Sequence, residues 1–260
     1  MNFSLHSLPA VAMCAGAFLI APAQSYGAPI TGTLSITGDA TVSATVLTFL
    51  CDVMSALGCP ANTGQFQVTG PLAQSGNFVA LANTIGDIKN LDQTSEPINQ
   101  VFSLPNFMTF LNDPNIAFDL TYISAGTGVD CAVSTSTTCT PRIPALVSSS
   151  NPLGLSPFNL SNTANGSSAS FSVSGETRNV ATGELAVFNG TFSATFTDTP
   201  GANNQDVAHV LAELAANGHI TSPYDGKFVA VASTPEPATM ALFGLGLLFV
   251  ASAGRKKRQG

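Results

Sequence analysis

Apolar and polar residues alternate along most of the chain after residue 28. In the segment TGTLSITGDATVSATVLTF, residues 31–49, Leu34 and Ile36 lie on the side of an extended backbone opposite to a row of hydroxyl side chains. A period of two is typical of a strand with one buried face. Because Gly38-Asp39 interrupts the alternation, we expect a strand, a turn and a second strand here.

The same alternation recurs in later segments of the chain, and in one of them it allows two interpretations. Strand-like segments are GQFQVTG, NFVAL, IAFDLTYI, ASFSVSGE, ELAVFNGTFSATFTD and GKFVAVAS. The Asn189-Gly190 step suits a type I′ hairpin turn. It equally suits a bulge in one long strand, because Phe188 and Phe192 keep the same phase on either side of it.

Two segments predict helices. Residues 105–113, PNFMTFLND, would form a short one. In NNQDVAHVLAELAANGH, residues 203–219, apolar residues recur at i, i+3, i+4 and i+7. Asn203 with Asp206 resembles a capping arrangement, and Gly218 follows the last turn as a C′ residue.

Together these elements predict an all-β fold, an antiparallel β-sandwich of the jelly-roll kind with one or two short helices. About eight to twelve short strands separated by Gly, Pro and Asn turns favour that architecture. Most of the 17 Phe lie on strand-like segments and should form the core. We expect one extracytoplasmic domain, residues 29–233, between two apolar ends.

The N-terminal end, residues 1–28, predicts a secretory signal peptide. An apolar run at 11–20 precedes an A-x-A pattern ending at Ala23, the arrangement that such peptides use. Cleavage after Ala23 and cleavage near Gly27 both remain open. No Lys or Arg precedes Lys89, so either the α-amino group supplies the positive charge of this peptide or the true start lies elsewhere.

The C-terminal end, residues 234–260, reads TPEPATMALFGLGLLFVASAGRKKRQG. Residues 238–253 carry no charge and predict a transmembrane helix of about 24 Å, shorter than the roughly 30 Å hydrocarbon layer. The basic tail that follows would snorkel and act as a membrane stop-transfer signal on the cytoplasmic side. Four of the eight basic residues of the chain form it: Arg255, Lys256, Lys257 and Arg258. A simple tail anchor and a buried helix are the alternatives.

A triplet of Pro235, Glu236 and Pro237 precedes this helix. Each proline keeps its predecessor extended, and extended backbone is what proteases usually bind. The segment contains the proline-glutamate-proline triplet, then a short helix with glycines, then a basic cluster. In these three features and their order it resembles the PEP-CTERM sorting signal of Gram-negative bacteria. The resemblance implies export by the general secretion machinery, temporary tethering in the inner membrane, and cleavage near the triplet by an exosortase, a membrane cysteine protease. The body would then reach the cell surface or the exopolysaccharide matrix.

Beyond Cys14, the cysteines fall into two local pairs with equal spacing: Cys51 with Cys59, and Cys131 with Cys139. Four cysteines allow three connectivities, and the matched short spacing favours these two disulfides. An exported chain usually oxidises its thiols. Zinc is the alternative, although spacing of the CxxC type is absent.

Charge excludes a nucleic-acid partner. Charged residues make up only 9% of the chain, against about 25% in average proteins. Between residues 29 and 233, fourteen acidic residues face four basic ones, a net charge of −10. Such a surface repels nucleic acid and anionic lipid.

The body offers little for catalysis, and we expect no enzyme, no cofactor and no metal site. His209 and His219 are ten residues apart and do not form a metal pair on one helical face. Asp113, Asp119 and Asp130 could serve as glycosidase carboxylates or calcium ligands, but turn and strand-edge roles fit them equally. Motifs of serine hydrolases, zinc proteases and nucleotide-binding loops are absent.

Three hypotheses for the body follow, in descending order. The first is a non-catalytic surface or matrix protein with Ser/Thr-rich faces that binds polysaccharide or glycans or carries sugars. The second is an ice-binding or adhesive, carbohydrate-binding module, since the same sorting signal also occurs on some ice-binding proteins. Regular T-x-T rows would mark it, and only Thr31 with Thr33 and Thr195 with Thr197 fit cleanly. An extracellular hydrolase comes third.

Overall fold

The structure is a computed structural model that describes residues 29–51, 58–197 and 205–232. The expected signal peptide at 1–28 and the expected sorting signal at 234–260 lie outside these residues. Across the three described ranges, helices are too short or too polar to span a bilayer.

The described chain forms one sheet of thirteen strands. Antiparallel pairing dominates, and only β8 and β9 run parallel. The bounds are β1 Gly32–Ser43, β2 Val46–Phe49, β3 Thr63–Val68, β4 Ile85–Lys89, β5 Leu91–Asp92, β6 Val101–Phe110, β7 Asp113–Ile123, β8 Val129–Asp130, β9 Cys139–Thr140, β10 Asn159–Thr163, β11 Gly166–Asn179, β12 Leu185–Thr197 and β13 His219–Ala232.

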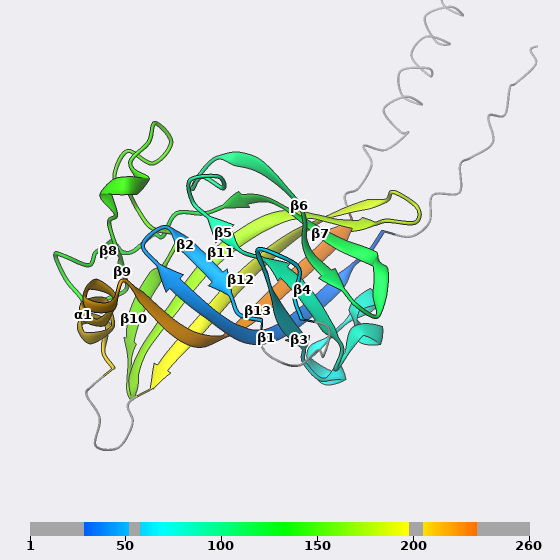
Figure 1. The fold of residues 1–260 in the computed structure, drawn as a ribbon, viewed down its shortest axis with the longest axis horizontal. Coiled ribbons are helices and arrows are strands. Elements are labelled where there is room, and N and C mark those ends of the chain that lie inside the picture. Colours follow the sequence, from blue (N-terminus) through cyan, green and yellow to red (C-terminus); the bar gives the residue numbers. More distant parts are fainter. Residues whose placement is uncertain (1–28, 52–57, 198–204, 233–260) are drawn as a thin grey trace, which may run out of the picture.

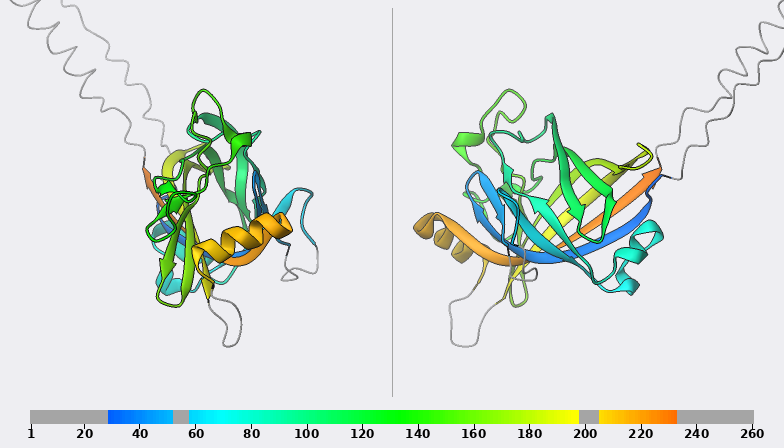
Figure 2. Two further views of the ribbon diagram at one scale, coloured as in Figure 1. Left: turned by 90° about the vertical axis from the view of Figure 1, so that its left-hand side faces the viewer. Right: turned by 45° about the vertical axis from the view of Figure 1, so that its right-hand side comes forward.

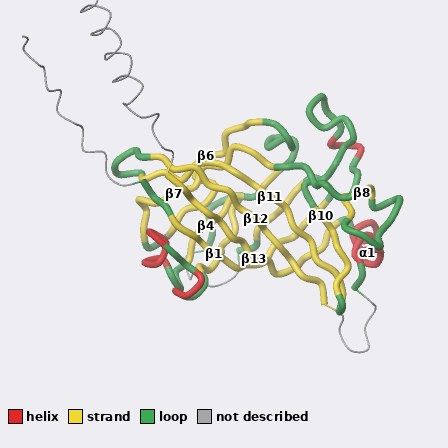
Figure 3. Tube along the Cα trace, turned by 180° about the vertical axis from the view of Figure 1, so that it is seen from behind, coloured by secondary structure: helices red, strands yellow, loops and turns green. Residues whose placement is uncertain are grey.

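Eight of these strands close into a barrel-like ring. Their order is β12-β13-β1-β3-β4-β6-β7-β11, and β11 pairs with β12 again from Gly166↔Thr197 to Arg178↔Leu185. The expected sandwich of two sheets is therefore wrong. Alternation shows only that each strand has one buried face, a pattern that sandwiches and barrels share. In Figures 1 and 3 the long strands at the front and the back of this curved sheet overlap in the view at an angle to one another.

Phenylalanine rings fill the interior, as expected. Phe118 of β7 lies with its ring centroid 5.0 Å from that of Phe188 in β12 and 5.9 Å from that of Phe228 in β13. All three side chains are buried. Barrels of eight strands have an interior that side chains can fill, and here the rings of facing strands interlock in mostly tilted and edge-to-face arrangements.

At two glycines a strand continues where the sequence suggested a break: the turn expected at Gly38-Asp39 is wrong, and of the two alternatives at Asn189-Gly190 the single long strand is correct, without a bulge. Strand β1 continues through Gly38-Asp39, because the ring of Tyr224 on β13 lies over Gly38: a Cβ there would be 2.9 Å from the tyrosine Oη. The chain turns between β1 and β2 instead. Asn189-Gly190 likewise lies inside the continuous strand β12, whose pairings with β11 and β13 show no register shift.

The helix expected at residues 105–113 is also wrong, because this segment belongs to β6 and the start of β7. Register shifts interrupt the β6–β7 pairing, and Asn106 has a positive φ of 51°. The irregularity leaves the adjacent Phe107 and Met108, and then Phe110, buried together. This spacing of apolar residues imitates that of a helix.

The second expected helix is present as α1, Val207–Asn217. Asp206 caps it by accepting a hydrogen bond from the His209 backbone N–H, and Gly218 ends it with a φ of 74°. The helix packs against β13, β10 and β11 at one end of the barrel (Figure 2). Three 3-10 turns complete the described elements: η1 Pro71–Ala73, η2 Gly76–Leu81 and η3 Pro144–Leu146.

Candidate functional site

A groove lined by polar and apolar residues runs over the outer face of β7, β11, β12 and β13, which lie side by side in Figure 3. The alternation of each strand decides which side chains reach this face: Phe188 and Phe192 point inward, so Asn189 and Thr191 point outward. Hydroxyl, amide and ammonium groups therefore gather in one place. The polar residues that line the groove are Tyr122, Ser124, Ser172, Ser174, Asn189, Thr191 and Lys227.

Strand register aligns these side chains in two rows across the sheet. Ser172 is opposite Thr191, which is opposite Lys227. In the neighbouring row, Ser174 lies between Tyr122 and Asn189. Cross-strand neighbours lie about 5 Å apart, a spacing that lets one ligand contact several of them. The groove supplies donors and acceptors and contains no carboxylate.

Tyr122 and Lys227, two of the residues that line the groove, differ in their surroundings. The Tyr122 hydroxyl donates to Asn99 Oδ1 at 3.2 Å, which holds the ring beside the groove. Lys227 is exposed and has no ion pair within the described ranges. Alternation in SASFSVS, residues 168–174, signals an outward row of serines, but it does not reveal which side chains of β7, β12 and β13 join them.

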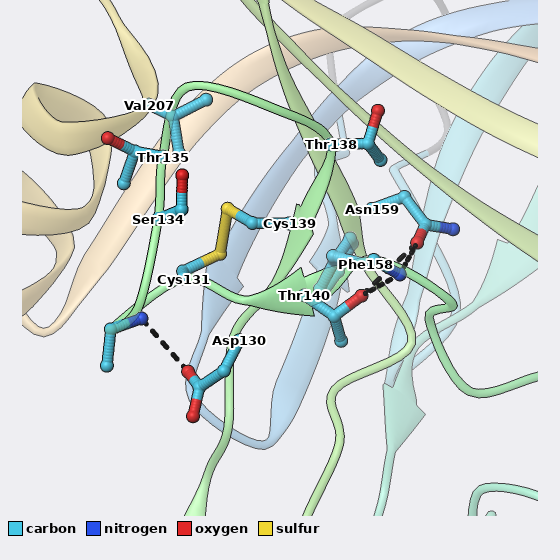
Figure 4. Close-up of a disulfide and its surroundings, with 12 residues drawn as sticks. Asp130, Cys131, Ser134, Thr135, Thr138, Cys139, Thr140, Phe158, Asn159 and Val207 are labelled. Carbon is cyan, nitrogen blue, oxygen red and sulfur yellow. Dashed lines mark hydrogen bonds between the residues drawn. A yellow bond between two sulfur atoms is a disulfide. The ribbon is translucent and has the colours of Figure 1, made fainter.

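The three candidate aspartates each serve local structure. Asp113 Oδ1 accepts from the Asn115 backbone N–H at 3.1 Å. Asp130 accepts from the Ala132 backbone N–H at 2.9 Å, shown in Figure 4, and pairs with Arg142 at 3.0 Å. In the part of the chain that the structure describes, His, Cys, Asp and Glu form no group of three or more that could hold a metal.

Asp119 links strands on the outside of the barrel. Its Oδ2 accepts from Arg178 Nε at 2.9 Å, and its Oδ1 from the Asn106 backbone N–H at 2.6 Å. Burial acts to raise the pKa of Asp119, but these hydrogen bonds and the nearby guanidinium outweigh it and lower the pKa. The arrangement stabilises an ionised carboxylate and ties β6, β7 and β11 together.

The two histidines are apart from one another and from the groove. His209 lies in α1 and is half-buried, and His219 begins β13 and is exposed. The His219 Nδ1 is 3.1 Å from the Asn217 carbonyl oxygen. The structure does not bring them together as ligands of one metal ion.

Both local disulfides are formed. Cys51 bonds to Cys59, and Cys131 bonds to Cys139. Figure 4 shows the second bond under the loop between β8 and β9, near Val207 at the start of α1. Cys131 and Cys139 are buried in a small apolar cluster with Leu160 and Val207. This disulfide therefore connects the β8–β9 loop with the helix end of the barrel.

The chain enters and leaves the barrel at the end opposite to α1 (Figure 1). Gly32 of β1 pairs with Ala230 of β13, two residues before the last residue of that strand, Ala232. Only Ser233 and Thr234 separate Ala232 from Pro235. The Pro235–Pro237 triplet therefore follows the last described strand after two residues of sequence.

Comparison with known families identifies the segment that follows β13. The family model described as the PEP-CTERM protein-sorting motif matches residues 233–258. The chain therefore carries a PEP-CTERM sorting signal, which confirms the resemblance seen in the sequence. No curated protein and no solved structure matches the chain. The sorting residues Pro235, Glu236 and Pro237 and the basic tail at 255–258 belong to the matched segment, outside the described residues.

Proposed function

We propose that this protein is a non-catalytic component of the cell surface or exopolysaccharide matrix, delivered there by exosortase processing of its C-terminal signal. The PEP-CTERM motif at 233–258 carries the proposal. It supports an exported surface protein whose partner in sorting is an exosortase-type membrane protease. In this proposal Pro235, Glu236 and Pro237 are recognised by the protease, and Arg255 to Arg258 hold the tail in the inner membrane until cleavage.

Subcellular fractionation tests this route. Replacing Pro235, Glu236 and Pro237 by alanine should leave the full-length protein in the inner-membrane fraction and reduce the surface fraction at least tenfold. The matched control is S233A/T234A, which changes the two residues next to the triplet. Equal surface delivery of the triplet variant and the wild type would refute the proposal, and so would retention of the control to the same extent.

We further propose that the outer groove binds the polysaccharide of the matrix. Its rows of hydroxyl and amide groups suit the hydrogen-bonding pattern of sugars, and Tyr122 offers an aromatic edge beside them. The acidic body makes a neutral polysaccharide the preferred ligand, since its net negative charge would repel an anionic one. An ice-binding role has less support, because the two rows across the sheet end on β13 at Lys227 and Val229, which carry no hydroxyl group.

Co-sedimentation with the exopolysaccharide of the producing cells tests the groove. The variant N189A/T191A should bind at least fivefold more weakly than wild type. T195A/T197A is the matched control, because it removes two outward threonines from the same strand beyond the groove. Unchanged binding by N189A/T191A, or an equal loss in the control, would refute a glycan site in the groove.

A further inference from the structure

An apolar pocket opens at the α1 end of the barrel, away from the outer groove. Its floor includes the stacked rings of Phe171 and Phe192, whose centroids are 4.8 Å apart, and the ring of Tyr224. Helix α1 contributes Val210, Leu211 and Leu214 to its wall.

The pocket is large enough for a narrow guest. Its volume is about 90 Å³, which lies between the roughly 10–15 Å³ needed by one water molecule and the roughly 150 Å³ of a cavity that accepts benzene. Apolar cavities of this kind do not hold water well, because water finds no partners there. Because this volume is smaller than that of the cavity that accepts benzene, a single alkyl chain is a better guest than an aromatic ring.

The mouth of the pocket is open to solvent. Leu211 and Leu214 of α1, Ala194 and Phe196 of β12 and Ile220 of β13 line the pocket and are all only half-buried. Apolar side chains left half-exposed around an opening are typical of binding sites. A chain could enter between the helix and the strands without unfolding either.

The charged residues near the mouth of the pocket determine which kind of head group a bound amphiphile can carry. Helix α1 carries Glu213 and no Lys or Arg. Arg142, next to the lining residue Pro141, is paired with Asp130 at 3.0 Å. An anionic head group would meet an acidic helix and no free cation among the described residues that line the pocket, so an uncharged head group is favoured.

We propose that this pocket binds the alkyl chain of an uncharged amphiphile, such as a long-chain alcohol or ester. The chain passes between α1 and β12 towards Phe171 and Phe192, and the head group stays at the mouth. This inference does not depend on polysaccharide binding by the outer groove, because the two sites share no residue.

Titration with a series of alcohols tests the proposal. Full-length protein with 13C-labelled leucine and valine methyl groups, reconstituted in lipid nanodiscs, is titrated with 1-butanol, 1-hexanol and 1-octanol. The methyl signals of Leu47, Leu211 and Leu214 should shift and saturate. Affinity should rise about fourfold for each added methylene until the pocket is full, since that is the factor expected for burying one such group. Octanoate at neutral pH should bind at least tenfold more weakly than octanol.

Two filling variants and one matched control complete the test. A194F and L214W each place a larger side chain in the pocket and should weaken octanol binding at least tenfold. A212F adds the same bulk as A194F on the exposed side of α1 and should leave binding unchanged. Thermal unfolding checks that each variant is folded, and having two filling variants keeps the test valid when one of them fails to fold.

Three outcomes would overturn binding of an alkyl chain in this pocket, and a fourth would overturn the choice of an uncharged head group. The first is a lack of saturable shifts in the pocket methyl groups. The second is unchanged octanol binding by a folded filling variant, or an equal loss in A212F. The third is contact of the pocket methyl groups with the chain's own residues 238–253 in the absence of alcohol, which would make the C-terminal segment the occupant. Octanoate binding as tightly as octanol would overturn the choice of an uncharged head group.

Discussion

Gly190 of β12 lies directly opposite Phe228 of β13, and the phenylalanine ring occupies the space where a side chain at position 190 would begin. A Cβ at Gly190 would be 2.3 Å from Phe228 Cδ1 and 2.5 Å from its Cε1. Phe228 is completely buried and packs against Phe118, Phe188 and Phe192. The absence of a side chain at 190 therefore allows the rings of adjacent strands to meet inside the barrel.

Gly190→Ala should lower the free energy of unfolding by about 1–3 kcal/mol, the usual cost of overpacking a core. The ring of Phe228 cannot move away freely, because three other rings surround it. Urea denaturation followed by circular dichroism measures the change. Asn189→Ala is the control, since this neighbour points outward and its loss should cost at most about 0.5 kcal/mol. Equal stability of the two variants would contradict this account of the glycine.

The Arg178–Asp119 pair predicts how stability depends on pH. Because the pKa of Asp119 is lower in the folded protein than its ordinary value of 3.8, the pair contributes stability above about pH 4. That contribution is lost as the pH falls through the lowered pKa and Asp119 takes up a proton. Arg178→Met should therefore cost about 1 kcal/mol at pH 7, a modest value because both side chains are partly exposed.

Urea denaturation of wild type and Arg178→Met between pH 2 and pH 7 checks this dependence. The difference between the two proteins should shrink as the pH falls below 3.8 and Asp119 takes up a proton. Burial raises the pKa of Asp87 and Glu96, so those groups favour the folded state at low pH, but they are present in both proteins and cancel. A difference that stays constant down to pH 2 would show that Arg178 acts by packing alone.

Much of the fold can be predicted from the local pattern of apolar and polar residues, but the closure of the sheet into a barrel cannot. The phase of Phe188 and Phe192 correctly predicted an inward face of β12, and the helical spacing from Val207 correctly predicted α1. Gly38 was misleading and Gly190 left two alternatives open, because a glycine that makes room for a ring across the sheet has the same sequence signature as one that makes a turn. Whether β11 returns to β12 depends on twist and strand length summed over the whole sheet, which alternation does not encode.

The functional sites also differ in how far the sequence alone predicts them. The sorting signal is contiguous, so Pro235, Glu236 and Pro237 could be recognised from the sequence alone. The outer groove is formed by side chains from four strands, and Tyr122 and Lys227 become neighbours of one groove only through strand register. The disulfide partners were predictable because a short loop holds Cys131 and Cys139 close together even before folding.

The two disulfides close loops of equal length and should nevertheless differ in their effect on stability. Loop-closure entropy predicts a cost of about 2.5 kcal/mol for losing either one. Cys51 is exposed, whereas Cys139 is fully buried against the cluster that contains Leu160 and Val207. C131S/C139S should therefore cost more than C51S/C59S, by about 1–2 kcal/mol, because it also places two hydroxyl groups in an apolar cluster.

Urea denaturation of the two double variants measures this difference, and amide hydrogen exchange locates it. Because the buried cluster joins the β8–β9 loop to Val207, C131S/C139S should speed exchange in α1, while C51S/C59S should leave α1 unchanged and serves as the control of equal loop length. Loss of α1 protection should also weaken binding of octanol in the pocket that α1 covers. Equal costs for both variants, with equal protection of α1, would show that the Cys131–Cys139 bond only restricts the unfolded chain and does not support the helix.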